Sequence, residues 1–290
     1  MHSIAYHHVD VFAPRAFTGN SLTVFPEAEG LNGAQMLAIT RELRHFESIF
    51  LQPTDTPNTY RARVFDLIEE LDFAGHPILG AASVLHDLRH SVEKETWSFV
   101  LNTKTVTATT SCNENGHSAL LDQGKPEFFG EVQQTFLGEL VAALNLSLSD
   151  LSSRFPPEVI STGLRYLVVP IECGLDRARI VHRNFDALLA TVGAQFAYVL
   201  DVNALEGRHW NNNGLLEDVA TGSGAGTVGA YVVKRERVPA NQEFILQQGR
   251  FTGRPSEIRV LGTGSSSHVC SVLVGGEVAR VGRGVLETLP

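Results

Sequence analysis

Two segments of this chain, about half its length apart, resemble each other. In both Glu70–His76 and Glu217–Ser223 an acidic residue stands five positions before a glycine, a polar residue follows that glycine, and a run rich in Gly and Ala comes next. A second pair agrees, because Thr18-Gly19 and Thr162-Gly163 each reach a proline at the same spacing. A half-chain repeat predicts two similar lobes facing each other. A ligand between them would meet two glycine-led helix N-termini, which favour anions.

The bulk properties exclude several classes of function. A chain of 290 residues is long enough for one large or two smaller domains. Its net charge of −9 argues against a nucleic-acid partner, which would need a basic face. No apolar run approaches the length of a membrane span, and the N-terminal segment lacks the pattern of a secretion signal. The three scattered cysteines, Cys112, Cys173 and Cys270, indicate free thiols and a cytoplasmic protein.

Hydrophobic periodicity predicts more strands than helices. Strands are expected at 60–65 and 97–101, with further candidates at 4–12, 22–25, 167–169, 198–200 and 244–246. Asn32 is expected to cap a helix whose apolar face consists of Met36, Ile39, Leu43 and Phe46. Similar patterns predict helices around 132–144 and 184–189.

The two segments that follow the repeated glycines are apolar all round. Residues 78–85 and 225–233 leave almost no polar face, which is typical of a buried helix. The sequence therefore predicts an α+β fold of two pseudo-symmetric lobes, each a rolled, mostly antiparallel sheet around a central helix. We expect an N-terminal lobe at 1–116, joined by the C-terminal strand 277–290, and a C-terminal lobe at 117–276, with the boundary near Asn113–Gly116.

The glycine-led segments also carry candidate chemistry. If Gly75 and Gly222 begin buried helices, their first N–H groups have no intrahelical partner and are available to a carboxylate. The simpler interpretation is a pair of tight turns whose N–H groups bond to neighbouring loops. Proton transfer needs a titratable group near such a site. The candidates are Glu47, which is flanked by apolar residues, His76 and Asp218. Each has a simpler interpretation, as an exposed boundary charge, a half-buried histidine and a helix N-terminal charge respectively.

Several motifs together resemble one known family. The residues Asp10–Ala13, Thr18–Ser21, Phe46–Phe50, Phe73–Gly80 and Glu217–Gly224 are similar, in this order, to the motifs of the PhzF-like family of phenazine-biosynthesis isomerases. The resemblance extends from about residue 4 to residue 284. It implies the diaminopimelate-epimerase fold, a cofactor-independent isomerase without a metal, and a homodimer.

The resemblance also implies roles for individual residues. Racemases of this fold carry a cysteine before each repeated glycine, but here Ala74 and Thr221 occupy those positions, which excludes a two-thiol mechanism. The family instead uses a glutamate, which aligns with Glu47, and His76 and Asp218 align with other catalytic residues. The remaining positions that align with substrate-binding residues are Asn20, Ser48, Gly75, Gly222 and Ser223. The implied reaction moves a proton on a small, amino- or hydroxy-substituted and in some cases cyclic carboxylate.

Three other interpretations remain open. Gly224–Gly229 has the spacing of a dinucleotide-binding fingerprint, but the residues before it make a poor strand. His86 and His90 stand one helical turn apart, as in some zinc enzymes, but without the usual glutamate. A non-catalytic protein of the same fold that binds a small carboxylate is the main alternative to an enzyme.

Overall fold

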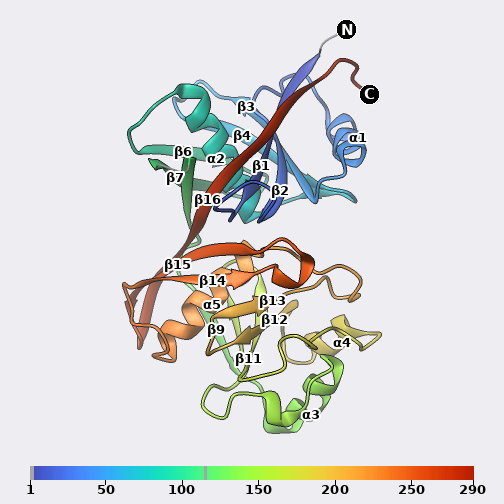
Figure 1. Ribbon diagram of the computed structural model, residues 1–290, viewed down its shortest axis with the longest axis vertical. Helices are drawn as coiled ribbons and strands as arrows, with labels where there is room; N and C mark the ends of the chain where they lie inside the picture. Colours follow the sequence, from blue (N-terminus) through green and yellow to red (C-terminus); the bar gives the residue numbers. More distant parts are fainter. Residues whose placement is uncertain (1–2, 114–115) are drawn as a thin grey trace. The chain divides into compact units, whose positions relative to one another are not determined.

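The computed structural model describes residues 3–113 and 116–290, and its chain forms two compact units. The first consists of Met1–Asp122 with Gly275–Pro290, and the second consists of Gln123–Val274. The boundary expected near Asn113–Gly116 falls partly on residues 114 and 115, which lie outside the described residues. The boundary between the two units lies after Asp122, at the end of the strand that begins at Gly116. Figure 1 shows the course of the chain.

The first unit is a closed sheet with a helix inside it. Its strand order is β1-β2-β3-β4-β6-β7-β8-β16, and an additional pairing of β1 with β16 closes the ring. The central helix is α2 (Gly75–Arg89), which contacts β1, β2, β7 and β8. The remaining elements of this unit are β1 (Ile4–Val11), β2 (Asn20–Phe25), α1 (Gly33–Leu43), β3 (Glu47–Pro53), β4 (Thr59–Asp66), β5 (Glu70–Leu71), β6 (Glu95–Val100), β7 (Thr105–Asn113), β8 (Gly116–Asp122) and the C-terminal part of β16 (His268–Leu286).

The second unit repeats this plan around α5 (Gly222–Lys234), which contacts β10, β11 and β15. Its strand order is β16-β15-β14-β13-β12-β11-β10-β9. The remaining elements are β9 (Glu127–Glu131), α3 (Gln134–Ala143), the 3₁₀ turn η1 (Leu148–Asp150), β10 (Glu158–Ser161), β11 (Arg165–Ile171), α4 (Phe185–Ala190), β12 (Phe196–Asp201), β13 (Glu206–Arg208), β14 (Glu243–Gln248), the 3₁₀ turn η2 (Arg250–Thr252), β15 (Ser256–Ser265) and the N-terminal part of β16.

The repeat is also visible in the strand directions. In the first unit the pairs β2–β3 and β4–β6 are parallel, and in the second unit the pairs β11–β12 and β13–β14 are parallel, while the other described registers are antiparallel. A parallel pair needs a crossover connection. Helices α1 and α2 lie in the two crossovers of the first unit, and α4 and α5 lie in those of the second. The predicted fold class, two similar lobes each built around one helix, is confirmed.

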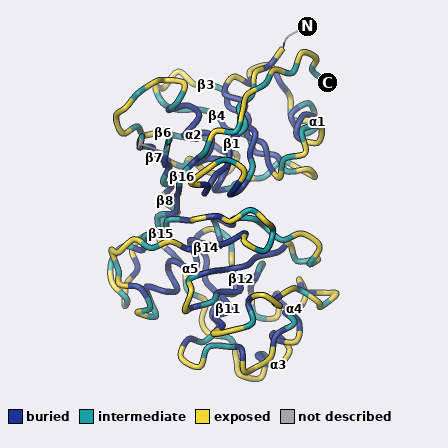
Figure 2. The backbone as a smooth tube through the Cα atoms, in the orientation of Figure 1, coloured by how far each residue is buried: buried dark blue, intermediate teal, exposed yellow. Residues whose placement is uncertain are grey.

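The two central helices are buried on all sides, as their sequences predict. Every residue from Gly75 to His86 is buried, and α5 is buried from Gly224 to Val233 (Figure 2). Glycine allows this close approach: a Cβ at Gly80 would clash with the Leu22 side chain, and one at Gly229 would lie 2.8 Å from Val272. Pro77 is the third residue of α2, a position that needs no intrahelical N–H donor.

The prediction that Phe46 belongs to the apolar face of α1 is wrong. Asn32 caps α1 with a full capping box to Gln35, and Met36 and Ile39 are buried as expected. The helix ends at Leu43, because Arg44 adopts a left-handed conformation with φ of 56°. Phe46 therefore lies beyond the helix, and 37% of its surface is exposed. Within the described residues no helix combines the length and apolar character needed to cross a membrane.

A buried ion-pair network joins the end of α5 to β10. The Glu158 carboxylate is fully buried and binds the Lys234 ammonium, and it lies 2.6 Å from the Arg235 guanidinium. We expect Glu158→Gln to lower the free energy of unfolding by about 2–4 kcal/mol, because two cations at this interface lose their buried anion. Glu131, which is 53% exposed and also pairs with Arg235, provides the control. Glu131→Gln should cost less than about 1 kcal/mol. Equal losses in urea unfolding for both variants would contradict this assignment.

A second buried carboxylate predicts a pH dependence of stability. Burial alone would raise the pKa of Asp150, but the Arg177 guanidinium and the Ser147 hydroxyl and N–H outweigh it and hold the pKa well below its usual value. A lowered folded-state pKa stabilises the fold above the unfolded pKa of about 3.9, and this contribution is lost as the pH falls below that value. We expect Asp150→Asn to cost about 1–3 kcal/mol at pH 7. The difference in free energy of unfolding between this variant and the wild type should shrink below about pH 4. Urea unfolding at several pH values measures it, and a difference that does not change with pH would contradict the assigned role of Asp150.

Candidate active site

Glu47 is a buried carboxylate at the start of a central strand. It is the first residue of β3, and it pairs with Leu22 of β2 on one side and Asp66 of β4 on the other. Only 8% of its surface is exposed, which excludes the interpretation as an exposed boundary charge. Burying a carboxylate between two strands is costly, so this position points to a specific use of the charge.

His76 lies beside this carboxylate. It is the second residue of α2, and its Nδ1 atom is 3.6 Å from Oε2 of Glu47. The side chains are exposed by only 7% and 10% respectively. The first unit therefore brings two of the three predicted catalytic residues together. A small shift on ligand binding would bring the His76 nitrogen and the Glu47 oxygen to hydrogen-bond distance.

Two of the three substrate-binding candidates in the first unit, Asn20 and Ser48, differ in their position. Asn20 is buried at the start of β2, the strand beside Glu47. Ser48 follows Glu47 in β3, so its side chain points to the opposite face of the sheet. There its hydroxyl lies 2.7 Å from that of Thr23. The structure therefore does not bring the Ser48 hydroxyl to the Glu47 carboxylate.

In the second unit Asp218 is held in the loop before α5. The Thr221 hydroxyl donates to Oδ2 of Asp218 at 2.7 Å. The buried Gln248 amide supports both residues, because its nitrogen donates to the Asp218 carbonyl at 2.9 Å and its oxygen accepts the Thr221 N–H at 3.1 Å. The Tyr198 hydroxyl donates to the same amide oxygen at 2.9 Å. The orientation of Asp218 is therefore set by a buried hydrogen-bond network.

The N-terminus of α5 begins at the predicted residues Gly222 and Ser223. Thr221 occupies the cap position, but its hydroxyl is engaged with Asp218 and Gln248. The Ser223 hydroxyl lies 2.8 Å from that of Tyr166. The Gly222 carbonyl accepts a bond from the Gln123 amide at 2.9 Å.

Both central helices therefore begin without the usual cap. The N-cap residues Ala74 and Thr221 make no side-chain capping bond, and neither helix has an acidic residue in its first turn. Helix α1, by contrast, has a complete capping box. Uncapped N–H groups and the positive end of the helix dipole form an anion-binding arrangement, as the glycine repeat predicts.

Near Asp218 and Ser223, the second unit also contains His209, Gln248 and Tyr166, which were not predicted as site residues. Burial lowers the pKa of His209 despite the nearby Asp218 charge, so this imidazole is neutral at neutral pH. Its Nδ1 atom bonds to the Ala197 carbonyl at 3.0 Å, and its ring packs against Tyr166. These residues lie in or next to strands far apart in the sequence, where no local pattern marks them.

The glycines of the possible dinucleotide fingerprint lie inside a helix. Gly224–Gly229 falls within α5, well after the end of β13, rather than in a tight turn between a strand and a helix. A dinucleotide-binding loop needs its glycines in that turn, where the backbone approaches the pyrophosphate. The fold therefore does not support this alternative.

Comparison with known proteins agrees with the fold and the motifs. The family model described as phenazine biosynthesis-like protein matches residues 9–284. The trans-2,3-dihydro-3-hydroxyanthranilate isomerase of Pseudomonas aeruginosa is 30% identical over 96% of this chain and 98% of its own length. A solved structure of a predicted epimerase from P. aeruginosa is 46% identical, covers 98% of this chain and 99% of that one, and has a TM-score of 0.90.

A more distant structure shares the fold alone. A hydroxyproline epimerase from Agrobacterium vitis has a TM-score of 0.63 at 13% identity, covering 98% of this chain and 92% of that one. The chain belongs to the phenazine biosynthesis-like family, and it is an isomerase of this family with a diaminopimelate-epimerase-like fold.

Proposed function

We propose that this isomerase moves a proton between carbon atoms of a small carboxylate-bearing metabolite, without a cofactor, and that Glu47 is the base. The observation that carries the proposal is the buried Glu47 carboxylate, 3.6 Å from His76 at the start of α2. Glu47 removes a proton from a carbon next to unsaturation and returns it to another carbon of the same molecule. A carboxylate in an apolar site is suited to this work because it is poorly solvated and held in place.

His76 and Asp218 have supporting roles in this proposal. They hold the amine or hydroxyl of the substrate and stabilise the charge that develops as the proton leaves. The network of Thr221 and Gln248 around Asp218 supports this role, because a fixed dipole or charge stabilises a transition state better than a mobile one. Asn20 and the backbone of Ser48 contribute to substrate binding from the strands beside Glu47.

In this proposal the N–H groups at Gly75 in the first unit, and those at Gly222 and Ser223 in the second unit, are carboxylate-binding donors. The N-cap residues of α2 and α5 make no side-chain capping bond, which supports this role, because the N-terminus of a helix favours an anion. The named relatives act on a ring that carries a carboxylate, an amine and a hydroxyl. This favours a cyclic, amino- or hydroxy-substituted carboxylate for the present chain.

The test is turnover of trans-2,3-dihydro-3-hydroxyanthranilate, followed by proton nuclear magnetic resonance and mass spectrometry. We expect a product of unchanged mass in which a ring hydrogen has moved, without added cofactor. If the compound is not turned over, a panel of cyclic amino- and hydroxycarboxylates is tested under the same conditions. Loss of hydrogen migration after addition of a chelator, with recovery on adding a metal and with no change in melting temperature, would contradict a cofactor-independent reaction.

The second candidate is a non-catalytic protein that binds a small carboxylate at the same helix N-termini. The uncapped helices support binding alone, whereas the buried Glu47–His76 pair favours catalysis. Calorimetry with the same panel measures whether each carboxylate binds, and analysis of the recovered compound shows whether it has been isomerised. A binding protein would take up a carboxylate and release it unchanged.

The resemblance also carries two expectations about the assembled protein. We propose that it is a homodimer and acts in the cytoplasm. Sedimentation equilibrium of the purified chain tests the first expectation, and a mass of one chain at micromolar concentration would contradict it. Fractionation of cells that express the tagged chain tests the second.

A further inference from the structure

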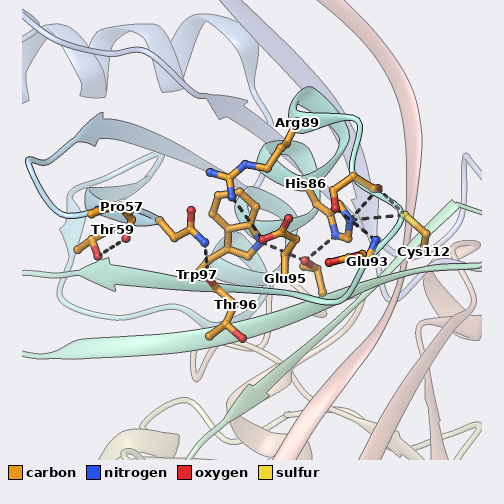
Figure 3. Close-up of polar contacts among 12 residues, drawn as sticks. Pro57, Thr59, His86, Arg89, Glu93, Glu95, Thr96, Trp97 and Cys112 are labelled. Atoms are coloured by element: carbon orange, nitrogen blue, oxygen red, sulfur yellow. Dashed lines mark hydrogen bonds and ion pairs between the residues drawn. The ribbon is translucent and has the colours of Figure 1, made fainter.

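Three side chains of the first unit meet near the C-terminal end of α2. They are His86 from α2, Cys112 from β7 and His117 from β8. Cys112 and His117 are directly opposite each other on the antiparallel β7–β8 pair, so their side chains share one face. One ligand atom from each of the three lies within 4.8 Å of the other two. Figure 3 shows His86 and Cys112 pointing toward one another.

The distance between His86 and Cys112 matches that between two ligands of a tetrahedral metal site. Sγ of Cys112 is 3.5 Å from Nε2 of His86. Zinc holds nitrogen at about 2.0–2.1 Å and sulfur at about 2.3 Å, which puts two such ligands about 3.5 Å apart. The Ser91 carbonyl oxygen lies 3.0 Å from the same nitrogen and 3.3 Å from the sulfur. It is placed to act as the fourth ligand.

The surroundings hold the His86 ring in this orientation. Nδ1 of His86 lies 2.7 Å from the Thr110 hydroxyl, which in turn accepts the Trp97 indole N–H at 3.0 Å. When Nε2 binds a cation, Nδ1 carries the ring proton and donates it to Thr110. A hydrogen bond of this kind on the second ring nitrogen is a regular feature of metal-bound histidines.

The other two ligands are accessible and of suitable type. His86 is fully buried, whereas Cys112 and His117 are half-buried, so an ion has a route to the cluster from solvent. Two imidazoles with one thiolate suit zinc and exclude hard ions such as magnesium.

We propose that His86, Cys112 and His117, with the Ser91 carbonyl, bind a zinc ion that fastens the end of α2 to the β7–β8 pair. Binding forms a zinc–sulfur bond and releases the Cys112 thiol proton to solvent. The site differs from the one that the His86–His90 spacing suggests. His90 is exposed and ends the helix in a left-handed conformation, away from the buried His86. The sequence alone predicts no metal, because the three ligands come from separate elements.

The test titrates Zn²⁺ and then Co²⁺ into the full chain, purified without a histidine tag and stripped with a chelator. We expect one zinc ion per chain and a melting temperature raised by about 5–10 °C at a hundredfold excess over the dissociation constant. Cobalt should give the thiolate charge-transfer absorption and the intense visible bands of a tetrahedral ion.

Matched variants assign the ligands. Cys112→Ser should abolish the thiolate absorption, and His117→Gln should weaken zinc binding at least about tenfold. Cys173→Ser, Cys270→Ser and His90→Gln alter residues outside the cluster and should keep the absorption and the affinity. The proposal is overturned if the unaltered chain shows no thiolate absorption with cobalt. It is equally overturned if the absorption survives Cys112→Ser, or if His90→Gln weakens zinc binding as much as His117→Gln does.

Discussion

Replacing Glu47 with glutamine should lower kcat by a factor of about 10²–10⁴ while leaving the fold intact. The amide has nearly the shape of the carboxylate but cannot accept a proton from carbon. The loss should appear mainly in kcat, since the proposed base acts on the reacting carbon rather than on the substrate carboxylate. The buried position of Glu47 beside His76 leads to a further expectation. The neutral amide should not destabilise the chain, because it avoids the cost of a buried charge.

The matched control is Glu42→Gln, which makes the same chemical change at an exposed position on α1. Its kcat and its melting temperature should equal those of the unaltered chain. Circular dichroism and thermal unfolding of both variants separate a loss of catalysis from a loss of fold. A Glu47→Gln variant with more than about a tenth of the normal kcat would remove Glu47 from the role of base.

Placing a negative charge at the start of α5 should stabilise the protein and disable it at the same time. Ser223 is the second residue of this uncapped helix. Aspartate at this position is favoured by the helix dipole by about 0.3–1 kcal/mol, and it can still accept a hydrogen bond from the Tyr166 hydroxyl. The same charge would repel a substrate carboxylate bound there. A repulsion of about 2–4 kcal/mol lowers kcat/KM roughly 30- to 1,000-fold.

The control for this prediction is Thr135→Asp. Thr135 is the exposed second residue of α3, which also lacks a side-chain cap, so the dipole effect is the same without a proposed ligand. Both variants should melt at or above the normal temperature, and only Ser223→Asp should lose activity. Normal kcat/KM in Ser223→Asp would show that the substrate carboxylate binds elsewhere.

Much of the fold could be predicted because the chain repeats itself. The two apolar, glycine-led segments could be identified as buried central helices, and the structure confirms both. The ends of elements were less predictable. Phe46 fits the apolar face of α1 by spacing, but Arg44 ends that helix by its backbone conformation, which the hydrophobic pattern does not encode.

The candidate site was predictable only where it coincides with local motifs. Glu47 and His76 lie in such motifs, and the structure places them 3.6 Å apart. The network of Gln248, Tyr198 and Thr221 around Asp218 could not be predicted, because it joins strands and loops that are distant in the sequence. The cluster of His86, Cys112 and His117 could not be predicted for the same reason, because its residues come from three separate elements. Ser48 shows a different limit, since strand alternation turns its side chain away from Glu47 although the two are adjacent in the sequence.

The most direct test of Glu47 as the proton-transferring base is hydrogen exchange during a single turnover in D₂O. The unaltered enzyme should place deuterium on a ring carbon of the product, because the Glu47 carboxyl exchanges its proton with solvent while it holds it. In Glu47→Gln, product formation and deuterium uptake should slow together by about 10²–10⁴. Product that forms and gains deuterium at the normal rate in this variant would contradict the proposed mechanism.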